Sequence, residues 1–232
     1  KEFNIDLHKA KYFAGHSLGE YSAIACSGYL EFKDVISILR VRGDAMQNSV
    51  PIGEGGMVAV LGAKIENIEK IIDKNNKDFQ IQIANDNSEG QIVISGKNDD
   101  LEKFMSLLKN LKIKSIKLPV SAPFHCSLMN RAAQTMNVEL KKLNFKKGSN
   151  VLISNITADE ISDLDELKSL LTKQIENRVR WRESVIKMID NGVNQFIEIG
   201  PGKVLSGLVK RIDRNVEVKT INSEEDIKNI IL

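Results

Sequence analysis

The sequence predicts a mixed α/β protein made of a body and an inserted smaller unit. Segments of helical and of strand character alternate along all 232 residues, which is typical of α/β proteins. The sequence pattern changes between residues 57 and 120, where short segments rich in β-branched residues, typical of strands, flank two predicted helices. We therefore expect an α/β body with a parallel sheet from residues 1–50 and 119–232, and a subdomain from residues 51–118.

The body begins with a short apolar strand that ends at Gly15 and leads into a helix from Gly19. A second helix over residues 30–48 carries an apolar stripe, and a glycine-rich break follows at 51–56. The later body elements are expected in this order: a helix over 125–143, a strand over 151–154, helices over 164–176 and 181–191, a strand over 195–199, a helix over 202–212, a strand over 216–220 and a helical stretch over 223–232.

The inserted unit has its own order of elements. The pattern predicts a strand over 57–61, a helix over 65–73, strands over 80–84 and 91–95 joined by a turn over 85–90, a helix over 101–111 and a strand over 113–118. This βαββαβ order is that of a ferredoxin-like unit.

Composition argues against several classes of protein. A net charge of +2 gives no broad basic surface, so we expect no nucleic-acid partner. Two cysteines without CxxC spacing predict neither a disulfide framework nor a zinc ribbon, and three histidines leave little for a metal site. No apolar run approaches the ~20 residues of a membrane span, so we expect no membrane partner. These features predict a cytoplasmic protein, or one in a plastid or mitochondrial lumen if the source is eukaryotic.

A candidate nucleophile lies between the first strand and the first helix. Residues 15–19 read Gly-His-Ser-Leu-Gly and fit the G-x-S-x-G pattern. On such a turn the serine is held in a strained conformation at the helix amino end, and small flanking residues let the chain bend. The backbone amide of Leu18 would then point at a developing oxyanion. A chance glycine-rich turn is the alternative, but the strand–turn–helix context favours a nucleophile at Ser17.

A serine nucleophile needs a base, and His125 is the only histidine that follows Ser17. Pro123 favours an extended approach, so we expect His125 in the first turn of the next helix, on the inward face with Met129. A helix amino end disfavours a protonated imidazole, and a general base must be neutral. A core histidine bonded to a backbone carbonyl is the alternative; the scarcity of histidine and the elbow favour the base.

The helix over 30–48 carries an arginine on its apolar side. At 100° per residue, Arg42 lies about 20° from the centre of the stripe, whereas Arg40 lies about 140° away. A buried guanidinium needs an anion, either Glu20 in a structural ion pair or a substrate carboxylate held by two parallel hydrogen bonds. Gln174 likewise lies on an apolar helix face, as a core amide or as a support for the site.

Four ordered segments make the chain similar to a known family. Residues 15–22 match a nucleophile motif, 41–47 a helix with an arginine, 123–129 a histidine segment and 198–207 a late glycine-rich turn. Over nearly its whole length the chain resembles the malonyl-CoA:acyl carrier protein transacylases. This resemblance implies an acyltransferase body of the α/β-hydrolase-like type.

The resemblance also implies a reaction. Malonyl would pass from malonyl-CoA to the phosphopantetheine thiol of holo-acyl carrier protein by a ping-pong mechanism, in fatty acid biosynthesis. Ser17 would carry the malonyl group, His125 would be the base and Arg42 would hold the malonyl carboxylate. Coenzyme A thioester is the substrate, so no cofactor is expected, and we expect a monomer.

The resemblance assigns supporting roles as well. A backbone carbonyl at the position of Gln174 would orient the imidazole, and the Leu18 amide would face the oxyanion. His16 and Phe124 would contact the substrate, with the bulk of Phe124 discouraging a methyl branch. The family has a second oxyanion donor in a glycine-rich motif near its amino terminus. No such motif precedes Ser17, so we expect the amino-terminal part of the body to be missing from this sequence.

Two rival functions remain open. A serine hydrolase in the order Ser…Asp…His would need an aspartate between Ser17 and His125, and the candidates are Asp86, Asp99 and Asp100. The second rival function is that of a non-catalytic module that only binds a carrier protein. The basic runs over 141–147 and 178–182 are either solvated faces or surfaces that steer an acidic carrier protein.

Overall fold

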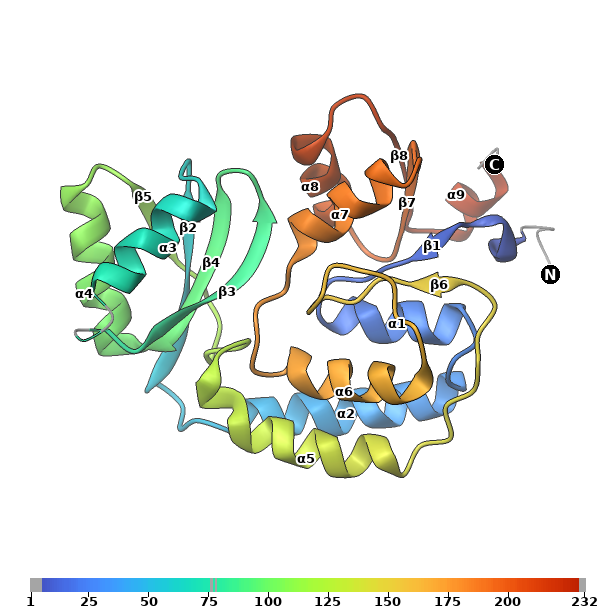
Figure 1. The fold of residues 1–232 in the computed structure, drawn as a ribbon, viewed down its shortest axis with the longest axis horizontal. Coiled ribbons are helices and arrows are strands. Elements are labelled where there is room, and N and C mark those ends of the chain that lie inside the picture. Colours follow the sequence, from blue (N-terminus) through green and yellow to red (C-terminus); the bar gives the residue numbers. More distant parts are fainter. Residues whose placement is uncertain (1–5, 76, 78, 230–232) are drawn as a thin grey trace.

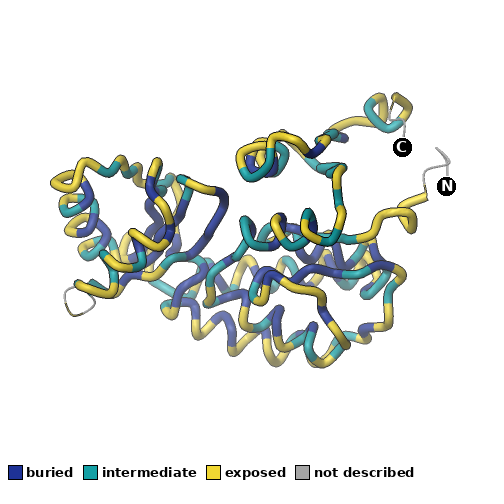
Figure 2. Tube along the Cα trace, turned by 45° about the horizontal axis from the view of Figure 1, so that its top comes forward, coloured by how far each residue is buried: buried dark blue, intermediate teal, exposed yellow. Residues whose placement is uncertain are grey.

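The computed structural model describes residues 6–75, 77 and 79–229. It is a mixed α/β structure, as predicted, with an inserted unit that lies beside a larger body (Figure 1). Along the helices of both parts, buried positions alternate with exposed ones (Figure 2). Each part therefore turns one face of its helices toward a core of its own.

Four helices form the main layer of the body. Tyr21, Ile24 and Met136 are fully buried among them in one apolar core. A short strand β1 pairs in parallel with β6, so the chain enters the first helix from the end of a parallel strand. The bounds are β1 (Tyr12–Phe13), α1 (Leu18–Cys26), α2 (Phe32–Gln47), α5 (Asn130–Lys141), β6 (Val151–Leu152) and α6 (Leu164–Gln174).

The carboxyl-terminal third forms a second layer around a separate core that includes Trp181, Val185 and Leu208. The parallel sheet predicted for the body is thus two separate parallel pairs, β1–β6 and β7–β8. None of the helices in the described ranges is long and apolar enough to cross a bilayer. The elements are α7 (Trp181–Asp190), β7 (Gln195–Ile199), α8 (Val204–Ile212), β8 (Glu217–Ile221) and α9 (Glu224–Asn229), with 3₁₀ turns at Leu7–Lys9 and Ser127–Met129.

The inserted unit is a four-stranded antiparallel sheet with two helices. Its strands lie in the order β3-β4-β2-β5, and Val58, Ile94 and Phe104 are fully buried in its own core. The elements are β2 (Gly55–Leu61), α3 (Ile65–Lys74), β3 (Ile81–Ser88), β4 (Gln91–Lys97), α4 (Asn98–Asn110) and β5 (Lys114–Lys117).

The turn predicted over residues 85–90 is wrong, because β3 continues to Ser88. The register of β3 against β4 shifts twice in this stretch. The backbone N–H of Asp86 donates to the Val179 carbonyl at 2.9 Å, and that of Val179 donates to the Ala84 carbonyl at 2.8 Å. A segment almost 100 residues away thus satisfies the strand, so polar residues that favour a turn locally remain extended here.

The helix predicted to begin at His125 begins at Asn130 instead. His125 lies before it with φ = 60°, in the left-handed region. The surrounding loop is held on the inserted sheet, since Ser95 Oγ donates to the Phe124 carbonyl at 2.5 Å and the Ser127 N–H donates to Gln82 Oε1 at 2.6 Å. These contacts keep His125 out of the helix that follows.

Candidate active site

The turn that carries Ser17 is strained and tightly packed. Ser17 has φ = 53° and ψ = −105°, directly before α1. A Cβ on Gly15 would lie 1.9 Å from the backbone carbon of Gly19, so a side chain at position 15 cannot fit without moving the helix. The N–H of Leu18, the first residue of α1, donates to no residue of the described chain. The predicted elbow is therefore present, with a free amide beside the hydroxyl.

The structure brings Ser17 and His125 together from segments 108 residues apart. Ser17 Oγ lies 2.7 Å from His125 Nε2, and His125 Nδ1 lies 2.7 Å from the backbone carbonyl of Gln174. Because a carbonyl oxygen only accepts, Nδ1 carries the hydrogen and Nε2 of the neutral ring accepts from the serine hydroxyl. The pair has the geometry of a nucleophile and its general base.

The environment keeps this imidazole neutral. Burial and the charge of Arg42 lower the pKa of His125 to about 3. The predicted cause, a helix amino end, does not apply because His125 precedes the helix. Its inward direction is confirmed, since only 4% of the residue is exposed.

Arg42 points from α2 into the same site. Its Nη2 donates to Ser17 Oγ and to Gln174 Oε1, both at 2.9 Å, and neither bond uses Nη1. The guanidinium lies over the Tyr21 ring, with its carbon 5.6 Å from the centroid, and its buried Nε has no hydrogen-bond partner. No carboxylate of the described residues forms an ion pair with it, so the structural pair with Glu20 is not made.

Gln174 joins the nucleophile, the base and the arginine. Besides its backbone bond to His125, its Nε2 donates to the Ser17 carbonyl at 2.9 Å and to Glu20 Oε2 at 2.5 Å. The side chain is fully buried at the end of α6. Of the two roles left open by the sequence, the contacts favour a support for the site.

Asn155 is a residue of the site that was not predicted from the sequence. Its Oδ1 accepts from the Ser17 N–H and its Nδ2 donates to the Gly15 carbonyl, both at 2.7 Å, so one amide clamps the elbow on either side. Asn155 follows β6, which is paired in parallel with the strand that leads to the elbow. Because parallel strands end at the same edge, this pairing is the signal that places Asn155 beside Ser17.

The remaining predicted residues lie at the border of the site. His16 Nε2 lies 2.7 Å from Asn87 Oδ1 of β3, and the ring packs 5.7 Å from that of Trp181. Phe124 precedes His125 and packs half-buried between the core of the main layer and a small cluster on the inserted sheet. These two residues thus lie where the inserted unit meets the body.

None of the three aspartates considered for a Ser–His–Asp triad contacts His125. Asp86 binds Arg182, with its two carboxylate oxygens 2.9–3.1 Å from the guanidinium nitrogens. Asp99 and Asp100 lie in the first turn of α4, where Asp100 accepts from the Gln80 N–H at 3.0 Å. A backbone carbonyl occupies the position that the hydrolase order would give to an aspartate.

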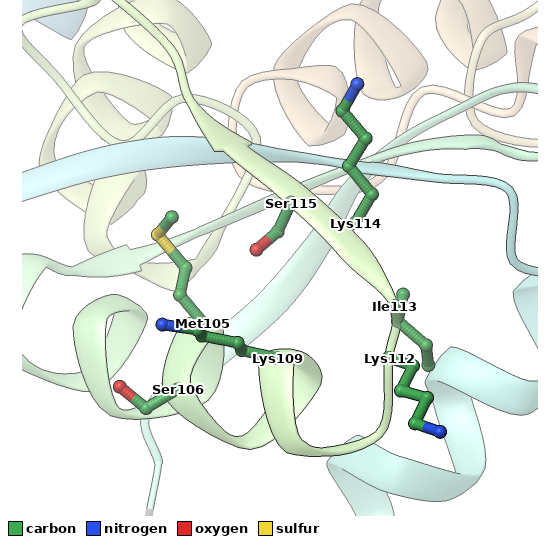
Figure 3. Close-up of a pocket in the computed structure, with 7 residues that line it drawn as sticks. All are labelled: Met105, Ser106, Lys109, Lys112, Ile113, Lys114 and Ser115. Atoms are coloured by element: carbon green, nitrogen blue, oxygen red, sulfur yellow. The ribbon is translucent and has the colours of Figure 1, made fainter.

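Other features do not add to the site. Cys126 is buried, donates to the Pro123 carbonyl and has its pKa raised to about 11 by burial, so it packs rather than reacts. Within the described ranges, no three His, Cys, Asp or Glu side chains are placed to hold a metal ion. A cavity of ≈ 450 Å³ lies between α4 and β5 and is lined by lysines such as Lys109 and Lys114, none of which belongs to this site (Figure 3).

Comparison with known proteins agrees with this geometry. The acyl transferase domain family matches residues 8–228. The malonyl CoA-acyl carrier protein transacylase of Bacillus subtilis (strain 168) is 43% identical over 217 residues, which are 93% of this chain and 68% of the relative. The transacylase of Escherichia coli (strain K12) is 38% identical over 90% of this chain and 68% of its own length.

Solved structures show the same relationship. The acyl-carrier-protein S-malonyltransferase from Bartonella henselae superposes with a TM-score of 0.94 at 40% identity, covering 98% of this chain and 73% of that one. A malonyl-transacylase in complex with its type II PKS acyl-carrier protein superposes with a TM-score of 0.90 at 35% identity, covering 94% and 72%. The chain therefore belongs to the malonyl CoA-acyl carrier protein transacylases and is an acyltransferase.

Proposed function

We propose that the protein transfers malonyl from malonyl-CoA to the phosphopantetheine thiol of holo-acyl carrier protein, through a malonyl ester of Ser17, in fatty acid biosynthesis. The observation that carries this proposal is the position of Arg42. Its buried guanidinium lies 2.9 Å from the nucleophile and has only neutral hydrogen-bond acceptors around it. A carboxylate on the acyl group would supply the counter-charge that this buried cation lacks.

In the first half-reaction, Ser17 Oγ attacks the thioester carbonyl while His125 Nε2 takes the hydroxyl proton. The Leu18 N–H stabilises the oxyanion of the tetrahedral intermediate. The intermediate collapses with loss of coenzyme A, whose sulfur receives the proton from His125. In the second half-reaction, His125 Nε2 takes the proton of the carrier-protein thiol while its sulfur attacks the malonyl ester. The ester C–O bond then breaks and His125 returns the proton to Ser17 Oγ.

Arg42 also links acyl selectivity to the base. Its charge is one of the two main causes that lower the pKa of His125. When a malonyl carboxylate binds the guanidinium, it offsets that charge and makes protonation of His125 less costly. An acetyl group has no carboxylate and leaves the penalty in place. Malonyl binding thus makes the base stronger as the reaction begins.

The border residues complete the proposed site. His16, fixed by Asn87, and Phe124 would contact the acyl group, with the bulk of Phe124 disfavouring a methyl branch. We extend the proposal to a monomer without a cofactor that works in the cytoplasm and binds neither nucleic acid nor membrane. Of the two basic runs, Arg178, Arg180 and Arg182 already pair with carboxylates, so we do not assign them to carrier-protein docking.

We further propose that residues 51–118 form a ferredoxin-like subdomain inserted into a body of residues 1–50 and 119–232. The strand order β3-β4-β2-β5 and the two helices support this division. The subdomain has its own apolar core and supplies Asn87 to the border of the site. The site therefore lies where the two parts meet.

Intact mass after incubation with malonyl-CoA alone tests the proposed function. We expect a gain of one malonyl group in the wild-type protein and none in Ser17→Ala, because only Ser17 carries the acyl group. Steady release of coenzyme A without an adduct would indicate a hydrolase. Neither adduct nor release would indicate a module that only binds, and an adduct that persists in Ser17→Ala would disprove the nucleophile.

A further inference from the structure

Glu20 is a fully buried carboxylate that touches the site without contacting the nucleophile or the base. It lies in the first turn of α1, three residues after Ser17. Its Oε2 accepts from Gln174 Nε2 at 2.5 Å, and its Oε1 accepts from the Asn155 N–H at 3.3 Å. Both oxygens therefore face donors, and neither the reaction steps above nor the fold requires an acid at this position.

Two acceptors decide which way the Gln174 amide points: the Glu20 carboxylate, 2.5 Å from Nε2, and the Ser17 carbonyl, 2.9 Å from Nε2. A carboxylate only accepts, so the Gln174 NH₂ must face Glu20 and the carbonyl Oε1 must face the other way. On that other side Oε1 accepts from Arg42 Nη2 at 2.9 Å. If the amide were rotated by 180°, an NH₂ group would face the guanidinium, and two donors would repel each other. Glu20 and the Ser17 carbonyl thus determine together, through one amide, whether Arg42 has an acceptor, and of the two only the Glu20 carboxylate belongs to a side chain that can be replaced.

We propose that Glu20 is a positioning residue whose carboxylate holds the Gln174 amide in the orientation that presents Oε1 to Arg42, and so aims the guanidinium at the acyl carboxylate beside Ser17. This inference rests on the proposed role of Arg42. It adds that the malonyl specificity of the site depends on a residue that contacts neither the substrate nor Arg42 through a hydrogen bond.

The ionisation of Glu20 sets the conditions for a test. Burial raises its pKa to about 7, while the Gln174 and Asn155 bonds and the charge of Arg42 on α2 oppose that increase. At pH 8 the group is therefore mainly ionised and accepts both bonds. Measurements at pH 8 therefore test the state in which the ionised Glu20 carboxylate accepts both hydrogen bonds.

Glu20→Gln weakens this chain of bonds with almost no change of shape. The substituted amide has one oxygen for two donors, so it offers Gln174 Nε2 at best a neutral acceptor in place of a carboxylate, and otherwise an opposing NH₂ group. In both cases the Ser17 carbonyl becomes the main acceptor that holds the Gln174 amide, so the amide turns or shifts more readily and Arg42 loses its acceptor. We expect the ratio of malonyl to acetyl acylation rates at pH 8, from single-turnover release of coenzyme A, to fall at least about tenfold.

A purely electrostatic role predicts the opposite sign. Removal of a negative charge near Arg42 would strengthen its attraction for the malonyl carboxylate and raise the ratio. A merely structural role predicts equal losses for malonyl-CoA and acetyl-CoA. Either result, or an unchanged ratio, would overturn the positioning role while the wild-type preference for malonyl still supports the proposed function. A wild-type protein without that preference would overturn both.

Two further variants guard against a trivial result. Glu198→Gln is the matched control, since the Glu198 carboxylate likewise accepts two hydrogen bonds, here from the backbone N–H groups of Leu205 and Ser206 at the start of α8, outside the site. We expect its malonyl-to-acetyl ratio to equal that of the wild type. If Glu20→Gln does not fold, Gln174→Met removes the same acceptor from Arg42 while its backbone carbonyl still binds His125. The ratio should fall there too, and an unchanged ratio would refute the proposal.

Discussion

Two regions of the molecule hold an arginine largely away from solvent, with Arg42 6% exposed and the Arg182 side chain 24% exposed, and they treat it differently. Where β3 of the inserted unit meets α7, Arg182 is paired with Asp86, whose side chain is 1% exposed. In the site, Arg42 binds the hydroxyl of Ser17 and the amide oxygen of Gln174, which are neutral. One cation has a carboxylate of the chain in direct contact, and the other has none in contact within the described residues.

This difference separates a structural cation from a functional one. In the Arg182–Asp86 pair each charge has its partner within the chain. The pair therefore affects the stability of the protein and the contact between the inserted unit and the body. The Arg42 charge is only partly compensated and stays available to an anion that is not part of the protein. Burial of arginine alone does not indicate a binding site; burial without a carboxylate does.

The largest expected effect comes from removal of the Arg42 cation. In Arg42→Ala the malonyl carboxylate would enter a buried site with no counter-charge, so we expect malonyl transfer to fall about two to three orders of magnitude. Acetyl transfer should fall far less, because acetyl has no carboxylate. Rates of acyl-enzyme formation with both thioesters measure the two losses.

Arg40→Ala is the matched control on the same helix. Arg40 and Asp44 form an exposed pair whose loss changes stability by less than about 0.5 kcal/mol. We expect wild-type rates with both substrates. Equal losses of malonyl and acetyl transfer in Arg42→Ala would mean that Arg42 is structural, and the contrast with Arg182 would then disappear.

The next effect is on stability, at the other arginine. Arg182→Ala leaves the buried Asp86 carboxylate without its partner, and we expect the free energy of unfolding to fall by about 2–4 kcal/mol in urea titrations. The malonyl-to-acetyl ratio of the folded protein should not change. Arg182→Met combined with Asp86→Asn should recover part of the lost stability, since no unpaired charge remains. A changed ratio would show that this pair also shapes the site.

The local sequence pattern predicted the inward position of Arg42 but not the ion pair of Arg182. Helical period alone places Arg42 on the inward face of α2, and the strand–turn–helix context alone places Ser17 at an elbow. Both inferences use residues within one or two turns of each other, where geometry is fixed by the backbone. The alternation of strand-like and helix-like segments likewise predicted the order of the elements in the inserted unit.

Such local patterns did not predict the contacts between distant segments. The sequence around Asp86 favours a turn, but Val179 extends the strand and Arg182 satisfies the carboxylate. Asn155 carries no local signal until β6 is known to lie beside the strand before Ser17. His125 was assigned to a helix that begins five residues later, because the bonds that hold its loop come from the inserted sheet.

The smallest expected effect is a pH dependence of stability that arises from the site. The pKa of His125 is lowered from 6.5 to about 3, chiefly by burial. Below pH 6.5 the unfolded chain binds a proton at His125 that the folded chain does not bind. The contribution of His125 to the free energy of unfolding therefore decreases as the pH falls. The pKa of Glu20 is raised from 4.5 to about 7 by burial, so its contribution is lost as the pH rises from 4.5. Each changes the free energy of unfolding by about 1.4 kcal/mol per pH unit, with opposite sign.

Between pH 4.5 and 6.5 the two contributions therefore cancel in the wild-type protein, and each variant exposes the other. Urea titrations at pH 4.5, 5.5 and 6.5 should show that, relative to the wild type, His125→Asn becomes less stable as the pH rises, because only Glu20 still titrates. Glu20→Gln should become more stable over the same range, because only His125 remains. Differences from the wild type that stay constant with pH would show that neither group titrates as its burial requires. Opposite slopes would show that the site, unlike the Arg182–Asp86 pair, buries ionisable groups at a cost to stability, which is the behaviour of a site arranged to bind and react.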